Sequence, residues 1–126
     1  MEEAGHKKLD VWNRAVSFVT RIYEVTRDYP REELYGIVSQ MRRAALSIPC
    51  NISEGAARQS TKEYIRFLYI SLGSASELDV QIIVSKNLNY LTDGMYSELL
   101  AGNKEISKML MGLIKSLKTR LQKTNP

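Results

Sequence analysis

The chain has 126 residues, of which 44% are hydrophobic and 25% charged, and its formal net charge is +4. These values are typical of one globular domain with its own hydrophobic core, so residues 1–126 are expected to form a single domain. The single cysteine excludes an internal disulfide and a metal site made of several cysteines. The N-terminus lacks the apolar run of a signal peptide, and no stretch is expected to reach the length of a membrane span, so we expect a cytoplasmic protein without a membrane partner.

The first predicted helix covers residues 10–27, with Asp10 as its expected N-cap. Its apolar residues recur at spacings of three and four, which marks one buried face. Arg14 and Arg21 lie beyond the edge of that face, on the outer side of the helix. Tyr29-Pro30 ends the helix, because a proline disfavours the helical conformation of the residue before it.

The second predicted helix covers residues 32–57. Its apolar residues recur along one face, and their phase continues through Pro49. Since a proline removes one backbone hydrogen bond and crowds the preceding turn, the helix is predicted to be kinked but continuous there. Cys50, in the middle of this helix, is expected to be a buried, unreactive thiol. The residues of the apolar face are Leu34, Ile37, Val38, Met41, Ala45, Ile48 and Ile52.

A turn at Arg58–Gln59 leads to a third helix, predicted for residues 61–86. Ser60 and Glu63 have the spacing of a capping box, in which each side chain accepts a hydrogen bond from the backbone N–H of the other. The two helices should form an antiparallel hairpin, in which residues whose numbers sum to about 119 lie at the same level. Small residues on both helices, Gly73 among them, allow the backbones to approach closely.

The same register brings opposite charges to one level. Arg42 and Arg43 lie level with Glu77, so an ion pair between Glu77 and one of these arginines is predicted. Glu54 lies level with Arg66, which offers a second pair. A structural role for these charges is favoured over a chemical site.

The third helix is apolar on more than one face. Between Ile65 and Leu72, only Arg66 and Ser71 are polar. A helix of this kind is buried on more than one side, and in a chain this short the second side is most simply covered by a neighbouring subunit.

The fourth predicted helix covers residues 93–122 and follows a loop at residues 87–91, with Thr92 or Asp93 as its cap. Its leucines and isoleucines recur at near-heptad spacing, which indicates one buried stripe. No segment alternates like a β-strand. The expected fold is therefore all-α, an antiparallel up-down-up-down four-helix bundle with short connections.

Basic residues dominate the end of the chain, where six of them follow from position 104 onward against the single acid Glu105. Lys104, Lys108, Lys115 and Lys118 have helical spacings that place them on one stripe about 21 Å long. Such a stripe can follow a phosphate backbone, and Arg14 and Arg21 offer a second basic face. It is equally typical of a solvated helix face, and the sequence leaves both interpretations open.

The residue types needed for catalysis are scarce. His6 is the only histidine, and the sequence has no cysteine–histidine cluster, no glycine-rich phosphate loop and no Ser/His/Asp set. Glu54, Glu77 and Asp79 are acids, but the arginines near them should keep their carboxylates ionised. The protein is therefore predicted not to be an enzyme and to need neither a cofactor nor a metal.

Two stretches carry a resemblance to a known family. Residues 40–55, QMRRAALSIPCNISEG, resemble the signature Q-x-R-R-A-x-x-S-I-P-x-N-I-x-E-G of the bacterial four-helix bundle proteins, also called 23S rRNA intervening-sequence proteins. Residues 67–78, FLYISLGSASEL, resemble the second element F-L-x-I-A-x-G-S-x-x-E-L, with Ser71 where alanine is usual. We interpret the matching residues mainly as packing and register residues; they include Arg42, Arg43, Pro49, Asn51, Glu54, Gly55, Gly73 and Glu77.

The resemblance also implies a function. The family is similar to the accessory protein of diversity-generating retroelements, a basic homopentamer that associates with a reverse transcriptase and nucleic acid. It therefore implies a closed homo-oligomeric ring, most simply a pentamer, with RNA, DNA or a nucleic-acid enzyme such as a reverse transcriptase as partner. Two function classes follow: a non-catalytic nucleic-acid-binding adaptor, and a protein-interaction scaffold whose basic surface is incidental.

Overall fold

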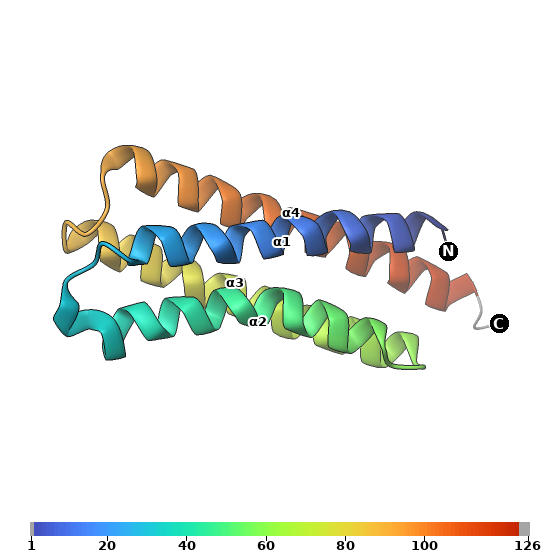
Figure 1. Ribbon diagram of the computed structural model, residues 1–126. Coiled ribbons are helices and arrows are strands. Elements are labelled where there is room, and N and C mark those ends of the chain that lie inside the picture. The colour runs from blue at the N-terminus through green and yellow to red at the C-terminus, as the bar shows by residue number, and fades with distance from the viewer. Residues whose placement is uncertain (1, 124–126) are drawn as a thin grey trace.

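The computed structural model describes residues 2–123, with side chains from Gly5 onward. The helices are α1 (Glu2–Thr26), α2 (Ser39–Ala56), α3 (Thr61–Asn87) and α4 (Asp93–Lys123), and no strand occurs within this range. They run alternately up and down, with the α2–α3 turn and both chain ends at one end of the bundle and the other two connections at the opposite end (Figure 1). The predicted all-α four-helix bundle is confirmed.

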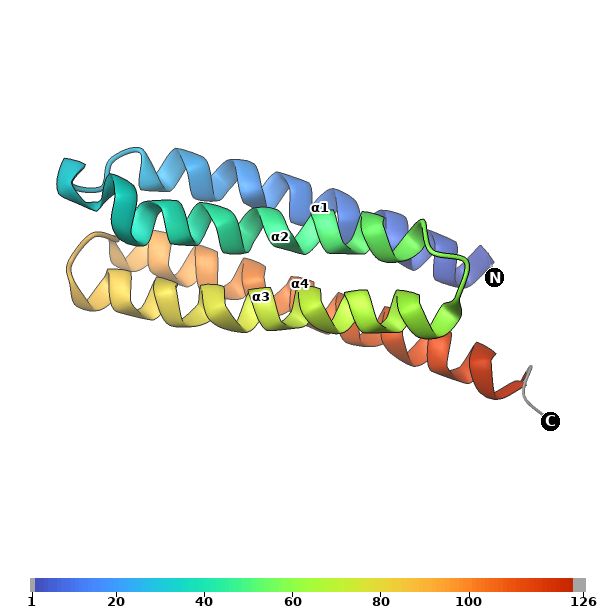
Figure 2. The ribbon, with the colours of Figure 1, turned by 90° about the horizontal axis from the view of Figure 1, so that it is seen from below.

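The core lies along the axis between the four helices, as the two perpendicular views show (Figures 1 and 2). The apolar stripes predicted from the helical spacing supply most of it. The largest fully buried side chains are Ile22, Met41, Ile48, Ile52, Leu68, Leu78, Ile82, Leu99, Ile106, Leu110, Leu113 and Ile114.

Helix α1 begins at Glu2, so the predicted start at Asp10 was wrong. Asp10 lies inside the helix and does not cap it. The early turns continue along α4, where Lys7 Nζ donates a hydrogen bond to Ser116 Oγ at 2.8 Å. Packing against α4 stabilises these first turns of α1. The local apolar pattern of the sequence does not show this tertiary contact.

The segment before α2 is not the regular helix that the apolar pattern predicted. A short 3₁₀ turn, Arg31–Glu33, leads into one wide turn, Leu34–Val38, and Gly36 within it has non-helical dihedral angles (φ −110°, ψ −117°). Leu34, assigned to the buried face, is 44% exposed as a result. Helix α2 then continues through Pro49, as predicted. The break in this region lies at Gly36.

The α2–α3 hairpin has the predicted register. Ser71 Oγ donates to the Ile48 carbonyl at 2.9 Å and Ser74 Oγ donates to Ser47 Oγ at 2.8 Å, which places residues with sums near 119 side by side. The glycine at the closest approach is Gly55, because a Cβ there would lie 2.8 Å from Cβ of Phe67.

Two expectations about this hairpin need correction. A Cβ on Gly73 would meet nothing within 4 Å, so Gly73 is not needed for close packing. Ser60 accepts from the Glu63 N–H at 3.2 Å, but the Glu63 carboxylate accepts from Arg66 at 3.1 Å. Only one half of the capping box forms, because the arginine one turn later competes for the carboxylate. At the next helix, Thr92 Oγ1 accepts from the Met95 N–H at 3.1 Å, which confirms Thr92 as a cap.

Helix α3 is long and apolar enough to cross a membrane by length and composition, so the expectation that no stretch reaches a membrane span was wrong. A helix of a bundle reaches a similar hydropathy when it packs on two neighbouring helices. Helix α3 packs against both α2 and α4.

Candidate nucleic-acid interface

The lysine stripe lies on the solvent side of α4. Lys104, Lys108, Lys115 and Lys118 are all exposed, whereas Ile106, Leu110, Leu113 and Leu117 on the opposite side are buried. From Ile106 to Lys123 the helix carries five basic residues and no acid. The core packing of α4 therefore holds these lysines outward, in a row that also contains the exposed Met111 between Lys108 and Lys115.

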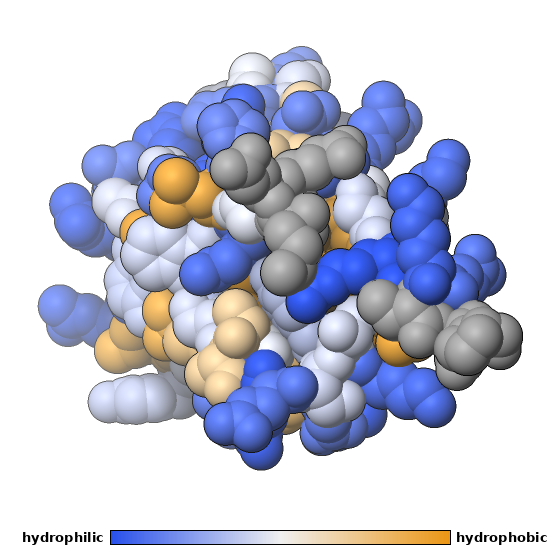
Figure 3. Space-filling view, turned by 90° about the vertical axis from the view of Figure 1, so that its right-hand side faces the viewer, coloured by the Kyte–Doolittle hydropathy of each residue, from blue (hydrophilic) through white to orange (hydrophobic). Residues whose placement is uncertain are grey.

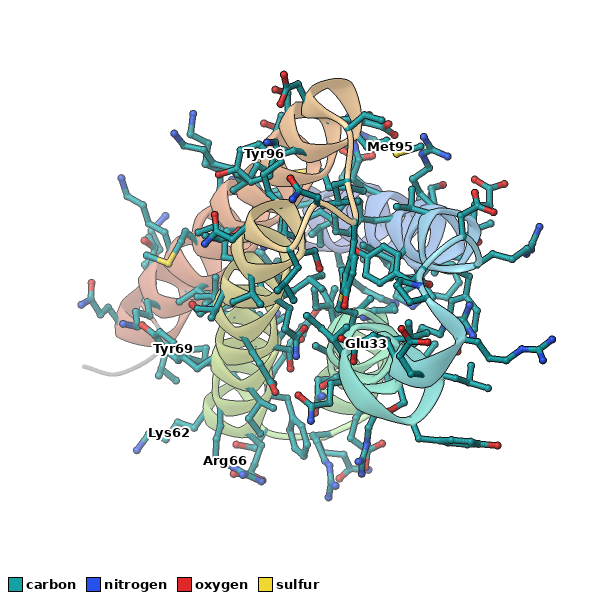
Figure 4. All side chains as sticks on the ribbon, turned by 90° about the vertical axis from the view of Figure 1, so that its left-hand side faces the viewer. Glu33, Lys62, Arg66, Tyr69, Met95 and Tyr96 are labelled. Carbon is teal, nitrogen blue, oxygen red and sulfur yellow. The ribbon has the colours of Figure 1, made fainter. Side chains whose placement is uncertain are left out.

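A groove between α3 and α4 borders this stripe. Its volume is about 480 Å³, and Lys118 Nζ donates to the Tyr69 hydroxyl at 2.7 Å and lies 5.2 Å from the centre of the Tyr69 ring. Tyr69 projects from the solvent side of α3, as do Lys62 and Arg66 nearer the start of that helix (Figure 4). The groove is lined by Tyr69, Met111, Gly112, Ile114, Lys115, Lys118, Thr119 and Gln122.

Sequence reasoning missed Tyr69 as part of this surface. Tyr69 belongs to the apolar run from Ile65 to Leu72, for which burial was predicted, but it is 44% exposed. Its position directly after the buried Leu68 and its contact with Lys118 combine a ring with a cation at one site. The observation that assigns Tyr69 to this surface is its contact with Lys118. That contact depends on the register between α3 and α4, so the sequence of neither helix alone predicts it.

The two arginines of α1 differ in their surroundings. Arg14 is exposed, and none of the described residues forms a hydrogen bond or ion pair with it. Arg21 donates to both carboxylate oxygens of Glu98, at 2.7 and 2.9 Å, and lies 3.6 Å from Glu24. The hydrogen bonds to Arg21 lower the pKa of Glu98 below its usual value, and they raise the pKa of Arg21. Arg21 therefore joins α1 to α4, and its charge is already matched within the chain.

The predicted ion pair between Glu77 and an arginine of the second helix does not form. Arg42 donates to Thr26 Oγ1 at 3.0 Å and to the Tyr23 carbonyl at 3.4 Å, with its guanidinium 4.5 Å from the centre of the Tyr23 ring. Position 42 faces α1, whereas Arg43 and Glu77 lie on outward faces and are exposed. Within residues 2–123 neither Arg43 nor Glu77 has a hydrogen-bond or ion-pair partner in its own chain.

The second predicted pair was wrong as well. Glu54 accepts from Arg58 at 2.8 Å, and Arg66 pairs with Glu63, so each charge is satisfied within its own helix or turn. Arg58 and Arg66 lie 4.9 and 4.6 Å from the centre of the Phe67 ring. These contacts pack the α2–α3 turn.

The remaining signature residues are structural. The Asn51 amide donates to the Ser47 carbonyl at 2.8 Å and to Ser47 Oγ at 2.9 Å, and Pro49 is buried. Cys50 is exposed, which corrects the expectation of a buried thiol, because its position faces away from both α1 and α3. Among the described residues, no group of three or more histidine, cysteine, aspartate or glutamate side chains is placed to hold a metal.

The end of the bundle that carries both chain ends and the α2–α3 turn presents a largely hydrophilic surface, with small separate apolar areas (Figure 3). The basic end of α4 and the start of α3 reach this region (Figure 1). The lysine stripe thus continues toward one end of the molecule.

Comparison with known proteins identifies relatives of this fold. The family model described as 23S rRNA-intervening sequence protein matches residues 7–112. A crystal structure of a protein of unknown function from the S23 ribosomal protein family of Bacteroides thetaiotaomicron is similar, with 27% sequence identity and a TM-score of 0.81 over 86% of this chain and 98% of that chain. No curated protein matches the chain.

Proposed function

Because this chain belongs to the 23S rRNA-intervening sequence protein family, we propose that it is a non-catalytic, homo-oligomeric protein that binds the backbone of RNA or DNA. The observation that carries the proposal is the exposed lysine stripe of α4, together with the groove beside Tyr69. The name of the family supports a role connected with RNA. A nucleic-acid enzyme, such as a reverse transcriptase, is the protein partner that the family resemblance implies.

The stripe suits phosphate contacts better than base recognition. An ammonium group on a flexible stem acts as a point charge, which attracts phosphate without distinguishing the bases. The four lysines cover about 21 Å of helix at 1.5 Å per residue. Tyr69 adds a ring on which an unpaired base can stack, so single-stranded segments fit the groove better than duplexes.

The acids of the chain support a non-catalytic role. Asp79 accepts a hydrogen bond from the Asn103 amide at 2.8 Å, and Glu63, Glu54 and Glu98 accept from arginines. The hydrogen bonds from arginines lower the pKa of Glu63 and of Glu98, and a carboxyl group with a lowered pKa is poorly suited to proton transfer near neutral pH.

The proposal is tested by removing two charges from the stripe. Lys108→Gln with Lys115→Gln keeps helix propensity while removing positive charge. The matched control, Arg27→Gln with Arg31→Gln, removes two exposed charges at the opposite end of the bundle. Affinity for a single-stranded RNA and a single-stranded DNA is measured against salt concentration. Since each lost phosphate contact lowers the salt slope by about 0.7, the stripe variant should lose about 1.4 and bind more weakly to every sequence alike.

Other outcomes have clear meanings. If both variants lose equal slope, net charge rather than the stripe governs binding, and α4 is not the contact surface. If the wild-type protein binds neither nucleic acid but retains a protein partner in a pull-down, the second candidate, a protein-interaction scaffold, is correct. The apolar residues exposed along α3 are the observation that favours that candidate.

A further inference from the structure

The solvent side of α3 is apolar along most of its length. Its outermost row recurs at spacings of three and four, is exposed throughout, and contains Glu77 as its only charged residue; we call this row the α3 ridge, and it consists of Ile70, Gly73, Glu77, Val80 and Val84. Val80 is 60% exposed. Since a solvated helix face is normally polar, a row of this composition indicates a surface that another molecule covers.

A second apolar surface lies on the other side of α2. There a depression of about 390 Å³ is bordered by Tyr35, which belongs to the wide turn before α2 and is 91% exposed. We call it the α1–α2 depression, and it is lined by Tyr23, Leu34, Tyr35, Ser39, Arg42, Arg43 and Leu46. Exposed aromatic and aliphatic side chains around an arginine are the composition of an interface centre.

The two surfaces are complementary in charge. The α1–α2 depression contains Arg43, which is exposed and has no partner among the described residues, and the α3 ridge contains Glu77, for which the same holds. Arg42 in the same depression is held by Thr26 and Tyr23 and adds positive charge to its wall. An unpaired arginine between apolar residues on one surface therefore matches an unpaired glutamate between apolar residues on the other.

We propose that the α3 ridge of one copy of this chain docks into the α1–α2 depression of the next copy, with Glu77 of one chain paired to Arg43 of its neighbour. This inference rests on the self-association included in the proposed function and assigns the surfaces that produce it. Because the two surfaces are different, the contact is head-to-tail and each copy has one of each to offer.

The heights of the two surfaces along the bundle favour a ring. The Ser74–Ser47 and Ser71–Ile48 contacts place Arg43 and Glu77 at nearly the same level on their antiparallel helices. A neighbour related by rotation about an axis parallel to the bundle can therefore bring its ridge to the depression without a shift along that axis. A head-to-tail contact without such a shift closes into a ring, whereas one with a shift produces a filament.

The test uses two variants that each block one surface. Arg43→Glu places a carboxylate opposite Glu77, and Val80→Glu places a charge in the apolar ridge. Each variant alone should have the mass of a single chain by light scattering at micromolar concentration. When the two are mixed, one chain still offers an intact ridge and the other an intact depression, so a 1:1 heterodimer of twice that mass should form and grow no further.

A charge exchange tests the named pair. Arg43→Glu combined with Glu77→Arg in the same chain restores opposite charges at every interface and should restore the wild-type mass. Arg27→Glu, a charge reversal of an exposed residue outside the depression, is the matched control and should leave the mass unchanged. Far-UV circular dichroism and the melting temperature of each variant show that the helices remain folded.

Several results would overturn the inference. If Arg43→Glu alone still assembles, the depression is not an interface, and a symmetric ridge-to-ridge contact is indicated when Val80→Glu alone is monomeric. A wild-type chain that stays monomeric at micromolar concentration but floats with lipid vesicles would assign the ridge to a membrane. The nucleic-acid test is separate, because it compares variants of α4 that keep both docking surfaces. A wild-type chain that assembles as described but binds neither RNA nor DNA would contradict the proposed nucleic-acid binding and leave this inference in place.

Discussion

Arg21 and Glu98 form the ion pair that joins the first and last helices, and both side chains are partly exposed. The guanidinium donates two hydrogen bonds to the carboxylate, which is the strongest geometry available to such a pair. Solvent screening limits the contribution of an exposed pair to under about 1 kcal/mol. Its effect should therefore be visible as a pH dependence more clearly than as a large change in stability.

The variant Glu98→Gln tests this pair. Because the pKa of Glu98 is lower in the folded state than in the unfolded chain, the pair stabilises the fold above the unfolded pKa, and the stabilisation is lost as the pH falls through the folded pKa. Urea denaturation should show a deficit of under about 1 kcal/mol at neutral pH that disappears in acid. A deficit that stays constant with pH would mean that packing, rather than charge, was lost.

Tyr64 is a partly buried side chain whose pKa is changed by loss of solvent. Burial raises the pKa of Tyr64 to about 12, and its hydroxyl has no hydrogen-bond partner among the described residues. Tyr64 lies against Gly55, so a ring fills the space that the glycine leaves at the closest approach of α2 and α3.

At the scale of elements, buried polar contacts complement this packing. Asn103, fully buried on α4, donates to the Ala75 carbonyl at 2.7 Å and to the Asp79 carboxylate at 2.8 Å, which joins α4 to α3. Phe18 of α1 packs against Gly102, where a Cβ would lie 2.8 Å from its ring. The α2–α3 and α1–α4 pairs thus approach most closely at a glycine, and the hydrogen bonds of Asn103 hold α4 to α3.

Two glycine variants separate close packing from helix propensity. Gly55→Ala places a Cβ 2.8 Å from Cβ of Phe67 and 3.2 Å from the Tyr64 carbonyl, so the backbones must move apart at a cost of about 1–3 kcal/mol. Gly112→Ala is the control in α4, because a Cβ there meets nothing within 4 Å and should stabilise the helix by up to about 1 kcal/mol. Chemical denaturation measures both, and equal shifts in the same direction would show that the α2–α3 approach is not tight.

For the whole molecule, the lysine stripe of α4 and the two proposed docking surfaces lie on different faces. The lysines lie on the outer side of α4. The α3 ridge lies on the outer side of α3, and the α1–α2 depression lies on the outer side of α1 and α2. An assembly through the ridge and the depression leaves the lysine stripe of every copy accessible. Repeating the stripe around a ring multiplies the number of phosphate contacts, so avidity should exceed the affinity of one copy.

A ring and a filament differ in how their mass depends on concentration. We expect light scattering of the wild-type chain over a concentration series to reach a plateau, because a closed ring has no free interface at which to grow. The family resemblance implies a plateau at five copies. A mass that continues to rise with concentration would show an open assembly and would contradict the ring while leaving the head-to-tail contact in place.

The sequence by itself determined that there are four helices, most of their buried faces and the α2–α3 register, but not the start of α1 or the wide turn at Leu34–Val38. The reason is that helical periodicity selects the face of Ile48 and Ile52, and a short turn allows only an antiparallel hairpin. The exposure of Lys108 and Lys115 followed from the same periodicity, because the leucines of α4 must face the core. These features depend on the spacing of residues within each helix and on the short turn, so they can be predicted from a single sequence.

Only the tertiary structure decided which side chains meet. Arg42 and Arg43 are adjacent in sequence, but a rotation of about 100° per residue directs the first toward Tyr23 and Thr26 and the second into solvent. The same effect exposed Cys50, and the contact of Lys118 with Tyr69 depended on how α4 lies against α3. A long side chain can reach several partners at one level, so the exact rotation of each helix about its axis, which packing of the whole core determines, selects among them.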